Sequence, residues 1–146
     1  MNKTVSISLL VLAFVAGFLI FYRQKPAPVQ EGPAAGTQQA WETKIDDQGN
    51  VSVVITPLDL SPQSAEWKFD VGMNTHSVEL DQDMTKIAVL VDDQGKEYKP
   101  LAWAGPTGGH HREGTLTFAR ITPTPKAIEL KITGIADVVR TFVWQP

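Results

Sequence analysis

Residues 66–71, with the sequence EWKFDV, decide the predicted fold class. The apolar side chains of Trp67, Phe69 and Val71 alternate with charged ones, and this period of two is typical of a strand with one buried and one solvent-facing side. Met73 continues the buried parity two residues further on. The stretch therefore predicts a half-buried β-strand.

The same alternation recurs along the rest of the chain. Further runs of alternating apolar and polar residues occupy positions 51–56, 77–81, 115–118, 128–133 and 141–144. They are rich in β-branched and aromatic residues and are separated by turn residues, as in all-β proteins. About eight or nine strands of this length predict two packed antiparallel sheets. We therefore expect an all-β, immunoglobulin-like antiparallel β-sandwich, with a small β-barrel as the alternative.

Two hairpins are expected, because two runs of turn residues, each with a glycine that tolerates positive φ, separate neighbouring strands. The runs are residues 46–50, DDQGN, between strands expected at 41–45 and 51–56, and residues 92–95, DDQG, between strands expected at 87–91 and 96–103. Local pairing of these strands is therefore the best-supported part of the predicted topology.

Proline and glycine residues predict two interruptions of the expected strands. Pro57 and Pro62 are expected to end the strand before them and to bound a crossing loop. Gly72 and Asn74 are expected to bend the chain before the strand at 77–81. His76, directly before that strand, falls on its buried parity.

The amino-terminal part predicts a membrane anchor. Residues 5–22, VSISLLVLAFVAGFLIFY, run from Val5 to Tyr22 without a charged side chain and are followed at once by Arg23 and Lys25. As a helix, these residues reach about 27 Å, close to the thickness of the hydrocarbon core of a bilayer. The run is longer than the usual signal-peptide core of about 7–15 residues, so we expect a retained transmembrane helix, a signal anchor. Cleavage further on, near residues 34–36 or 39–40, is the alternative.

Three segments follow from this interpretation. Residues 1–23 are the membrane anchor, and residues 24–40, rich in Pro, Gly, Ala and Gln, are a flexible tether. Residues 41–146 are the β-sandwich domain. The positive charges that flank the anchor do not decide its orientation. We expect the large domain outside the cytoplasm, because a short amino-terminal tail before a large β domain is the usual layout of a signal anchor.

Charge and composition exclude several classes of function. The chain has a net charge of −3, and residues 41–146 carry 10 basic and 15 acidic side chains, a net charge of 10 − 15 = −5. An acidic domain with no basic run lacks the electrostatic footprint of a nucleic-acid partner. The absence of cysteine excludes disulfides, zinc thiolate sites and cysteine nucleophiles.

The chain is expected not to be an enzyme. Ser77 beside His76 is the one suggestive nucleophile–base pair, but adjacent residues on a strand point to opposite faces. No glycine-flanked nucleophile elbow is present. Asp81 and Asp83 are explained more simply as solvated turn residues than as an acid–base pair.

One loop carries residue types suited to metal binding. Residues 104–114, AGPTGGHHREG, contain four glycines and the adjacent His110 and His111. With His76 and Met73 at the expected strand break, all three histidines of the chain can meet at one end of the sandwich. Imidazoles, with Met73 or a carboxylate from Asp81 or Glu113 as a further ligand, suit copper or zinc. No cofactor is expected otherwise.

Simpler interpretations stand beside this one. His76 is explained as a half-buried structural histidine, and Met73 as core filler. His110 and His111 have opposite parity if the chain is extended there. Arg112 and the glycine amides offer a further alternative, the capture of a carboxylate or phosphate.

Three blocks of the sequence carry a resemblance. They are THSVELD at residues 75–81, GGHHREGTLTF at residues 108–118, and FVW at residues 142–144. Together they resemble a family of uncharacterised, membrane-anchored bacterial or archaeal extracytoplasmic β-sandwich domains, over most of residues 66–144. The resemblance implies a fold and a compartment. It implies no catalytic or ligand residue.

Two functional hypotheses follow. The first is a membrane-tethered, extracytoplasmic interaction or accessory module that offers one sandwich end or an edge strand to a protein partner. The alternative is extracytoplasmic copper or zinc binding through His76, His110 and His111. A solvent-exposed apolar patch containing Trp41, Trp103 or Trp144 favours the first hypothesis.

Overall fold

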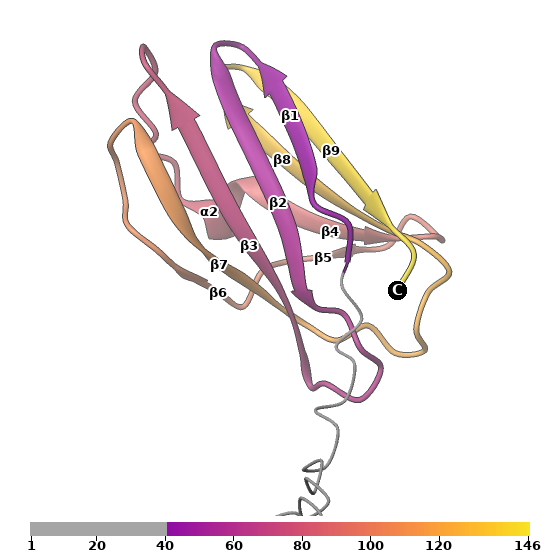
Figure 1. Ribbon diagram of the computed structural model, residues 1–146. Helices are drawn as coiled ribbons and strands as arrows, with labels where there is room; N and C mark the ends of the chain where they lie inside the picture. Colours follow the sequence, from indigo (N-terminus) through magenta and orange to yellow (C-terminus); the bar gives the residue numbers. More distant parts are fainter. Residues whose placement is uncertain (1–40) are drawn as a thin grey trace, which may run out of the picture. The chain divides into compact units, whose positions relative to one another are not determined.

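The computed structural model describes residues 41–146 (Figure 1). The predicted anchor, from Val5 to Tyr22, and the predicted tether, residues 24–40, lie outside the described residues and stay predictions. Within residues 41–146, no helix has the length and apolar character needed to cross a membrane.

Residues 41–146 form nine strands and one short helix. The elements are β1 (Lys44–Gln48), β2 (Val51–Asp59), β3 (Glu66–Thr75), α2 (Met84–Ile87), β4 (Ala88–Asp92), β5 (Glu97–Tyr98), β6 (Ala102–Ala104), β7 (His111–Ala119), β8 (Ile128–Ile135) and β9 (Val138–Trp144). The strands form two antiparallel sheets with the orders β1-β2-β3-β7-β6 and β5-β4-β8-β9. The predicted two-sheet sandwich is confirmed, and the barrel alternative is wrong because the two sheets are separate.

The core lies between the inner faces of the sheets. The alternation predicted for β3 is confirmed, since Trp67, Phe69, Val71 and Met73 are all 0% exposed. Phe69 lies edge-on to Phe118 of β7, with ring centroids 5.8 Å apart. Aromatic side chains therefore fill the middle of the sandwich.

The first hairpin is confirmed with a tighter turn than predicted. Gly49 and Asn50 have φ values of 58° and 60°, as the two central residues of a type I′ turn require. Gln48 pairs with Val51, so the preceding Asp–Asp–Gln residues extend β1 rather than forming a loop.

Pro57 does not end β2, contrary to the prediction. The strand continues to Asp59 with an irregularity between Pro57 and Asp59. Because β1 begins at Lys44, opposite Ile55, β2 has no neighbour on that side at Pro57. Proline is tolerated at such an edge position and beside an irregularity of the ladder.

Asp59 stabilises the turn that follows β2. Its carboxylate accepts hydrogen bonds from the Ser64 hydroxyl and from the Ser61 amide. The Ser64 bond, and then the Ser61 bond, lower the pKa of Asp59 below its usual value of 3.8. A lowered pKa in the folded state contributes stability above the unfolded pKa and loses it as the pH falls through the folded pKa.

We expect wild-type protein to be more stable than Asp59→Asn at neutral pH, because the charged carboxylate makes the stronger bonds. The difference should shrink as the pH falls below 3.8. Urea unfolding at a series of pH values measures it. A difference between the two proteins that does not change with pH contradicts this role for the carboxylate.

The second hairpin is confirmed only for β4 and β5, which pair with each other. Asp92 accepts hydrogen bonds from the amides of Gln94 and Lys96 and thereby shapes the β4–β5 turn. The strand predicted at 96–103 is split, because Trp103 belongs to β6 in the other sheet. Pro100 lies between β5 and β6 and cannot donate to a ladder, which favours the crossing at that point.

The bend expected at Gly72 and Asn74 is wrong, because β3 runs without interruption to Thr75. There the Thr75 hydroxyl accepts hydrogen bonds from the amides of Ser77 and Val78, which turns the chain out of the sheet. No strand forms at 77–81, and His76 is exposed rather than buried. The predicted parity failed because the turn at Thr75 interrupts the alternation.

Candidate functional site

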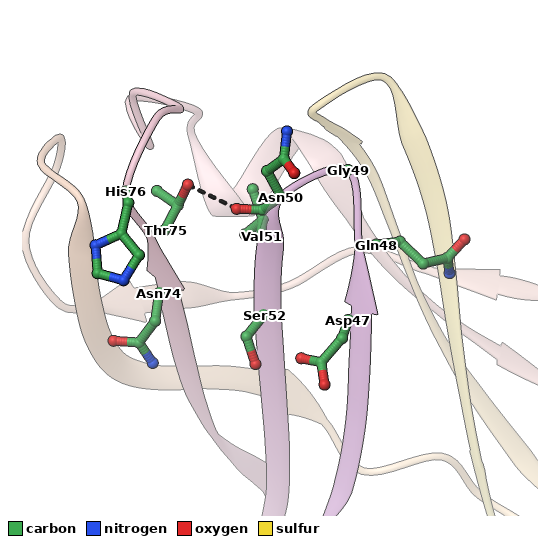
Figure 2. A pocket seen from close by; sticks show the side chains of 9 residues that line it. All are labelled: Asp47, Gln48, Gly49, Asn50, Val51, Ser52, Asn74, Thr75 and His76. Carbon is green, nitrogen blue, oxygen red and sulfur yellow. Dashed lines mark hydrogen bonds between the residues drawn. The ribbon is translucent and has the colours of Figure 1, made fainter.

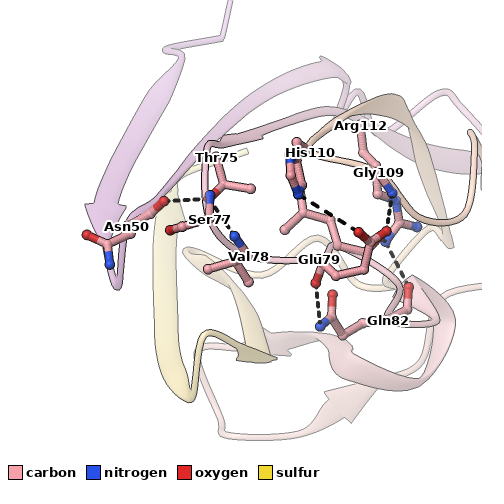
Figure 3. Close-up of polar contacts among 10 residues, drawn as sticks. Asn50, Thr75, Ser77, Val78, Glu79, Gln82, Gly109, His110 and Arg112 are labelled. Carbon is pink, nitrogen blue, oxygen red and sulfur yellow. Dashed lines mark hydrogen bonds and ion pairs between the residues drawn. The ribbon is translucent and has the colours of Figure 1, made fainter.

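The three histidines divide into a pair and a single residue. The rings of His76 and His111 are nearly perpendicular, at 81°, and their centroids lie 6.3 Å apart. His110 is directed elsewhere, with its Nε2 3.9 Å from Oε2 of Glu79 (Figure 3). Within residues 41–146, no cluster of three or more His, Cys, Asp or Glu side chains is placed to hold a metal ion.

Met73 lies on the other side of the sheet from these imidazoles. Its side chain is fully buried in the core, whereas its neighbour Asn74 is exposed on the outer face. This placement agrees with the interpretation of Met73 as core filler. The four residues predicted as one metal site therefore occupy three different surroundings.

A row of polar side chains crosses the outer face of the five-stranded sheet. Asp47 pairs with Ser52, Ser52 pairs with Asn74, and Asn74 pairs with His111. At the end of the row, Nδ1 of His111 lies 2.7 Å from Oδ1 of Asn74. The register of four strands thus places an amide oxygen against one imidazole nitrogen.

The row borders a shallow hollow of about 530 Å³. Figure 2 shows His76 and Asn74 of the β3 end, Ser52 of β2 and Asp47 of β1 around it. Sequence reasoning missed Asn74 as the partner of His111, and Ser52 and Asp47 as residues that line the same hollow as His76. Strand alternation places each on a polar face, but only the pairing register brings them together.

Glu79 joins the loop after β3 to the loop before β7 (Figure 3). Its Oε1 accepts a hydrogen bond of 2.5 Å from the amide of Gly109. Leu80 extends the connection, since its amide donates to Gly109 O and its carbonyl accepts from the Gly108 amide. Gly108 and Gly109 have φ values of 84° and 95°, so the glycines of this loop are required by its backbone.

Arg112 fixes the same two loops from inside. Its side chain is 2% exposed. Nε donates to Pro106 O at 3.0 Å, and Nη1 donates to the carbonyls of Leu80 and Gln82 at 2.8 and 2.9 Å. The guanidinium also stacks on Trp103 at 5.4 Å. Because the guanidinium faces loop carbonyls, the geometry does not favour the alternative in which Arg112 captures an anion from solvent.

Burial lowers the pKa of Arg112, and the negative charges of Asp81 and Asp83 oppose this effect. We expect Arg112→Ala to lower the free energy of unfolding by about 2–3 kcal/mol, because it removes three charge-assisted hydrogen bonds to buried and part-buried loop carbonyls. Arg112→Lys should restore only part of this, since one ammonium cannot reproduce the planar fork. Urea denaturation measures the stability of both variants. An Arg112→Ala protein of wild-type stability would show that Arg112 does not stabilise the two loops.

No tryptophan of residues 41–146 forms an exposed patch. Trp67 and Trp144 are buried, and Trp41 and Trp103 are half-buried. The aromatic surface considered for a partner is therefore not formed in the described part of the chain. The exposed large apolar side chains are Ile45, Leu58, Leu101, Val139 and Val143.

Two of these exposed side chains lie on β9, an edge strand. β9 has seven residues and pairs only with β8. Its outward side chains are Val139, Thr141 and Val143, and the two valines are 58% and 47% exposed. Within the described residues, the β9 backbone forms no backbone hydrogen bond outside its sheet. This edge is seven residues long and free of proline, and its one charged residue, Arg140, is buried on the inner face.

The other three edge strands differ from β9. β5 and β6 have only two and three residues. β1 has five residues, and three of them, Lys44, Asp46 and Asp47, are charged. Short length and charge are the usual devices that keep edge strands from pairing. Of the described edges, only β9 has neither a short length nor a charged side chain at its surface.

Comparison with known proteins gives structural similarity alone. No family model matches the sequence, and no curated protein sequence matches it. The chain is structurally similar to the secreted protein MPT63 from Mycobacterium tuberculosis, with 17% identity and a TM-score of 0.41 over 80% of this chain and 99% of that one. It is also similar to a DUF4426 family protein from Pseudomonas aeruginosa PAO1, with 13% identity and a TM-score of 0.43 over 70% and 94% of the two chains.

Proposed function

We propose that this chain is a membrane-tethered, extracytoplasmic interaction module that binds a protein partner along the edge of β9, and that it is not an enzyme. The uncharged run from Val5 to Tyr22 supports the tether. The three sequence blocks described above support membership in a family of membrane-anchored extracytoplasmic β-sandwich domains. The open edge of β9 is the observation that carries the proposed binding.

An open edge binds an extended segment by adding it to the sheet. The outer N–H and C=O groups of β9 supply main-chain hydrogen bonds, which give affinity without regard to sequence. Selectivity comes from the side chains opposite Val139, Thr141 and Val143. β-Branched and aromatic residues pack best against such a surface. We therefore propose an extended partner segment with these residues at alternate positions.

The inward-facing side chains of β9 already pack in the core and have their hydrogen-bond partners. Phe142 and Trp144 are buried, and Nε1 of Trp144 donates to Glu42 O at 2.7 Å. Figure 1 shows β1 and β9 next to each other at this side of the sandwich. A partner therefore gains the backbone edge and the outer valines without displacing core contacts. The net charge of residues 41–146 disfavours nucleic acid as that partner.

Cysteine labelling tests both the compartment and the edge, because the chain has no cysteine of its own. Val139→Cys reports on the β9 edge, and Glu113→Cys, exposed on the central strand β7, is the matched control. A membrane-impermeant maleimide is applied to intact cells and to the purified full chain. We expect Glu113→Cys to react in both, and Val139→Cys to react fully only after purification.

The proposed compartment and the proposed binding at the β9 edge are contradicted by different results. If Glu113→Cys reacts only after cells are lysed, the domain does not lie outside the cytoplasm. If Val139→Cys reacts equally fast in cells and in purified protein, no partner covers the edge. The labelling rate of Glu113→Cys corrects for differences in how well the maleimide reaches the domain in the two preparations.

A second candidate function is extracytoplasmic copper or zinc binding. One observation favours it: Asn74 contacts Nδ1 of His111, and the ring of His76 lies beside that of His111. Imidazoles held in this way are common ligands of both metals.

A further inference from the structure

We propose that His76 and His111 alone form a two-imidazole site for divalent copper, with Asn74 as its positioning residue. The proposal rests on the second candidate function and replaces the four-residue set with a pair. Met73 faces the core, and His110 is directed to Glu79, so neither belongs to the site.

The contact with Asn74 fixes the tautomer of His111. Oδ1 of an asparagine amide only accepts hydrogen bonds, so the nitrogen 2.7 Å from it, Nδ1, carries the proton. Nε2 then keeps its lone pair and is free to bind a cation. Metal-binding histidines are usually held in this way, with the second ring nitrogen donating to a carbonyl or carboxylate.

His76 is placed to supply the second nitrogen. It is exposed in the loop directly after β3, and within the described residues its side chain makes no hydrogen bond. Its ring lies 6.3 Å from that of His111, centroid to centroid. Because metal–imidazole bonds are about 2.0–2.1 Å long, one ion between the rings requires the His76 side chain to rotate until one of its ring nitrogens faces Nε2 of His111. The side chain that rotates is exposed.

The surroundings favour copper over zinc. Both imidazoles are exposed, so water can supply the remaining ligands of an ion held between them. Two imidazoles with oxygen ligands suit the tetragonal geometry of divalent copper. Copper also stands above zinc in the order of affinities for nitrogen and oxygen sites.

Calorimetric titration of copper sulfate into the full-length chain tests the site, with copper electron paramagnetic resonance as the second readout. We expect His76→Ala and His111→Ala each to weaken binding at least about tenfold. His110→Ala, which removes a neighbouring exposed imidazole, is the matched control and should change the affinity by less than about twofold. The resonance spectrum of wild-type protein should show two coordinated nitrogens, and that of each of the first two variants only one.

Asn74 has a separate test. We expect Asn74→Ala to weaken copper binding about tenfold and to lose the Nδ1–H tautomer of His111, as seen by nitrogen NMR of the metal-free protein. Asn74→Asp retains an acceptor oxygen and should restore the tautomer and the affinity. A variant that weakens binding without changing the tautomer contradicts the positioning role.

Three outcomes decide the proposal. Copper bound with equal affinity by wild-type, His76→Ala and His111→Ala proteins overturns this site but leaves metal binding elsewhere standing. Loss of affinity in His110→Ala as large as in the other two restores the three-histidine site. No measurable binding of copper by the wild-type chain removes both this site and the second candidate function.

Discussion

Asp46→Ala is expected to lower the free energy of unfolding of the domain by about 3–5 kcal/mol, because it leaves a buried guanidinium without its counter-charge. Arg140 is 0% exposed. Its Nε lies 3.1 Å from Oδ1 of Asp46, at ion-pair distance but without hydrogen-bond alignment. Its other nitrogens donate to backbone carbonyls, Nη1 to Ile135 O at 2.8 Å and Nη2 to Gln48 O at 2.6 Å. The arginine thus joins β9 to the first hairpin.

The matched control for this change is Asp47→Ala, in the next residue of β1 but on the opposite, exposed face. It should change stability by less than about 0.5 kcal/mol. Adding Arg140→Met to Asp46→Ala should recover much of the loss, because an apolar side chain of similar size needs no counter-charge. Urea denaturation measures all three. Equal losses in Asp46→Ala and Asp47→Ala contradict the role given to the buried pair.

Phe69→Ala is expected to cost about 3–5 kcal/mol, the usual range for truncating a buried aromatic side chain. Phe69 is 0% exposed on β3. It contacts Trp144 of the opposite sheet, with ring centroids 5.5 Å apart, as well as Phe118 of its own sheet. Removing the ring therefore opens a cavity at the centre of the sandwich.

Phe69→Leu separates the cavity from other effects, because leucine fills much of the space and should cost clearly less than alanine. Val139→Ala, at an exposed position, should stay within about 0.5 kcal/mol. Guanidinium denaturation with fitted slopes measures the series. A loss below about 1 kcal/mol for Phe69→Ala contradicts a tightly packed centre at this residue.

The sequence predicted those parts of the fold that depend on local patterns. The period of two at Trp67, Phe69 and Val71 identified β3 and its buried face, and the glycine at 49 identified the first hairpin. The predicted strand at 77–81 failed because the Thr75 hydroxyl ends β3 through hydrogen bonds to the next turn. An alternating pattern alone cannot distinguish such a loop from a strand, since both bury every second residue.

The candidate sites depend on strand order and register, which the sequence does not reveal. The histidine residue types were recognised, but the pairing of Asn74 with His111 comes from the β3–β7 register. The edge position of β9 comes from the order of the strands in its sheet. The alternation of Val139, Thr141 and Val143 would look the same in a central strand whose outer face was covered.

Site-specific photocrosslinking in native membranes tests the proposed β9 interaction most directly. A photoreactive side chain is placed at position 139 or 143 of β9, and at position 113 of β7 as the control. The proposal predicts one discrete product from both β9 positions and none from position 113, and mass spectrometry of the product identifies the partner or a second copy of this chain. No product from either β9 position, or the same product from all three positions, would contradict binding along this edge.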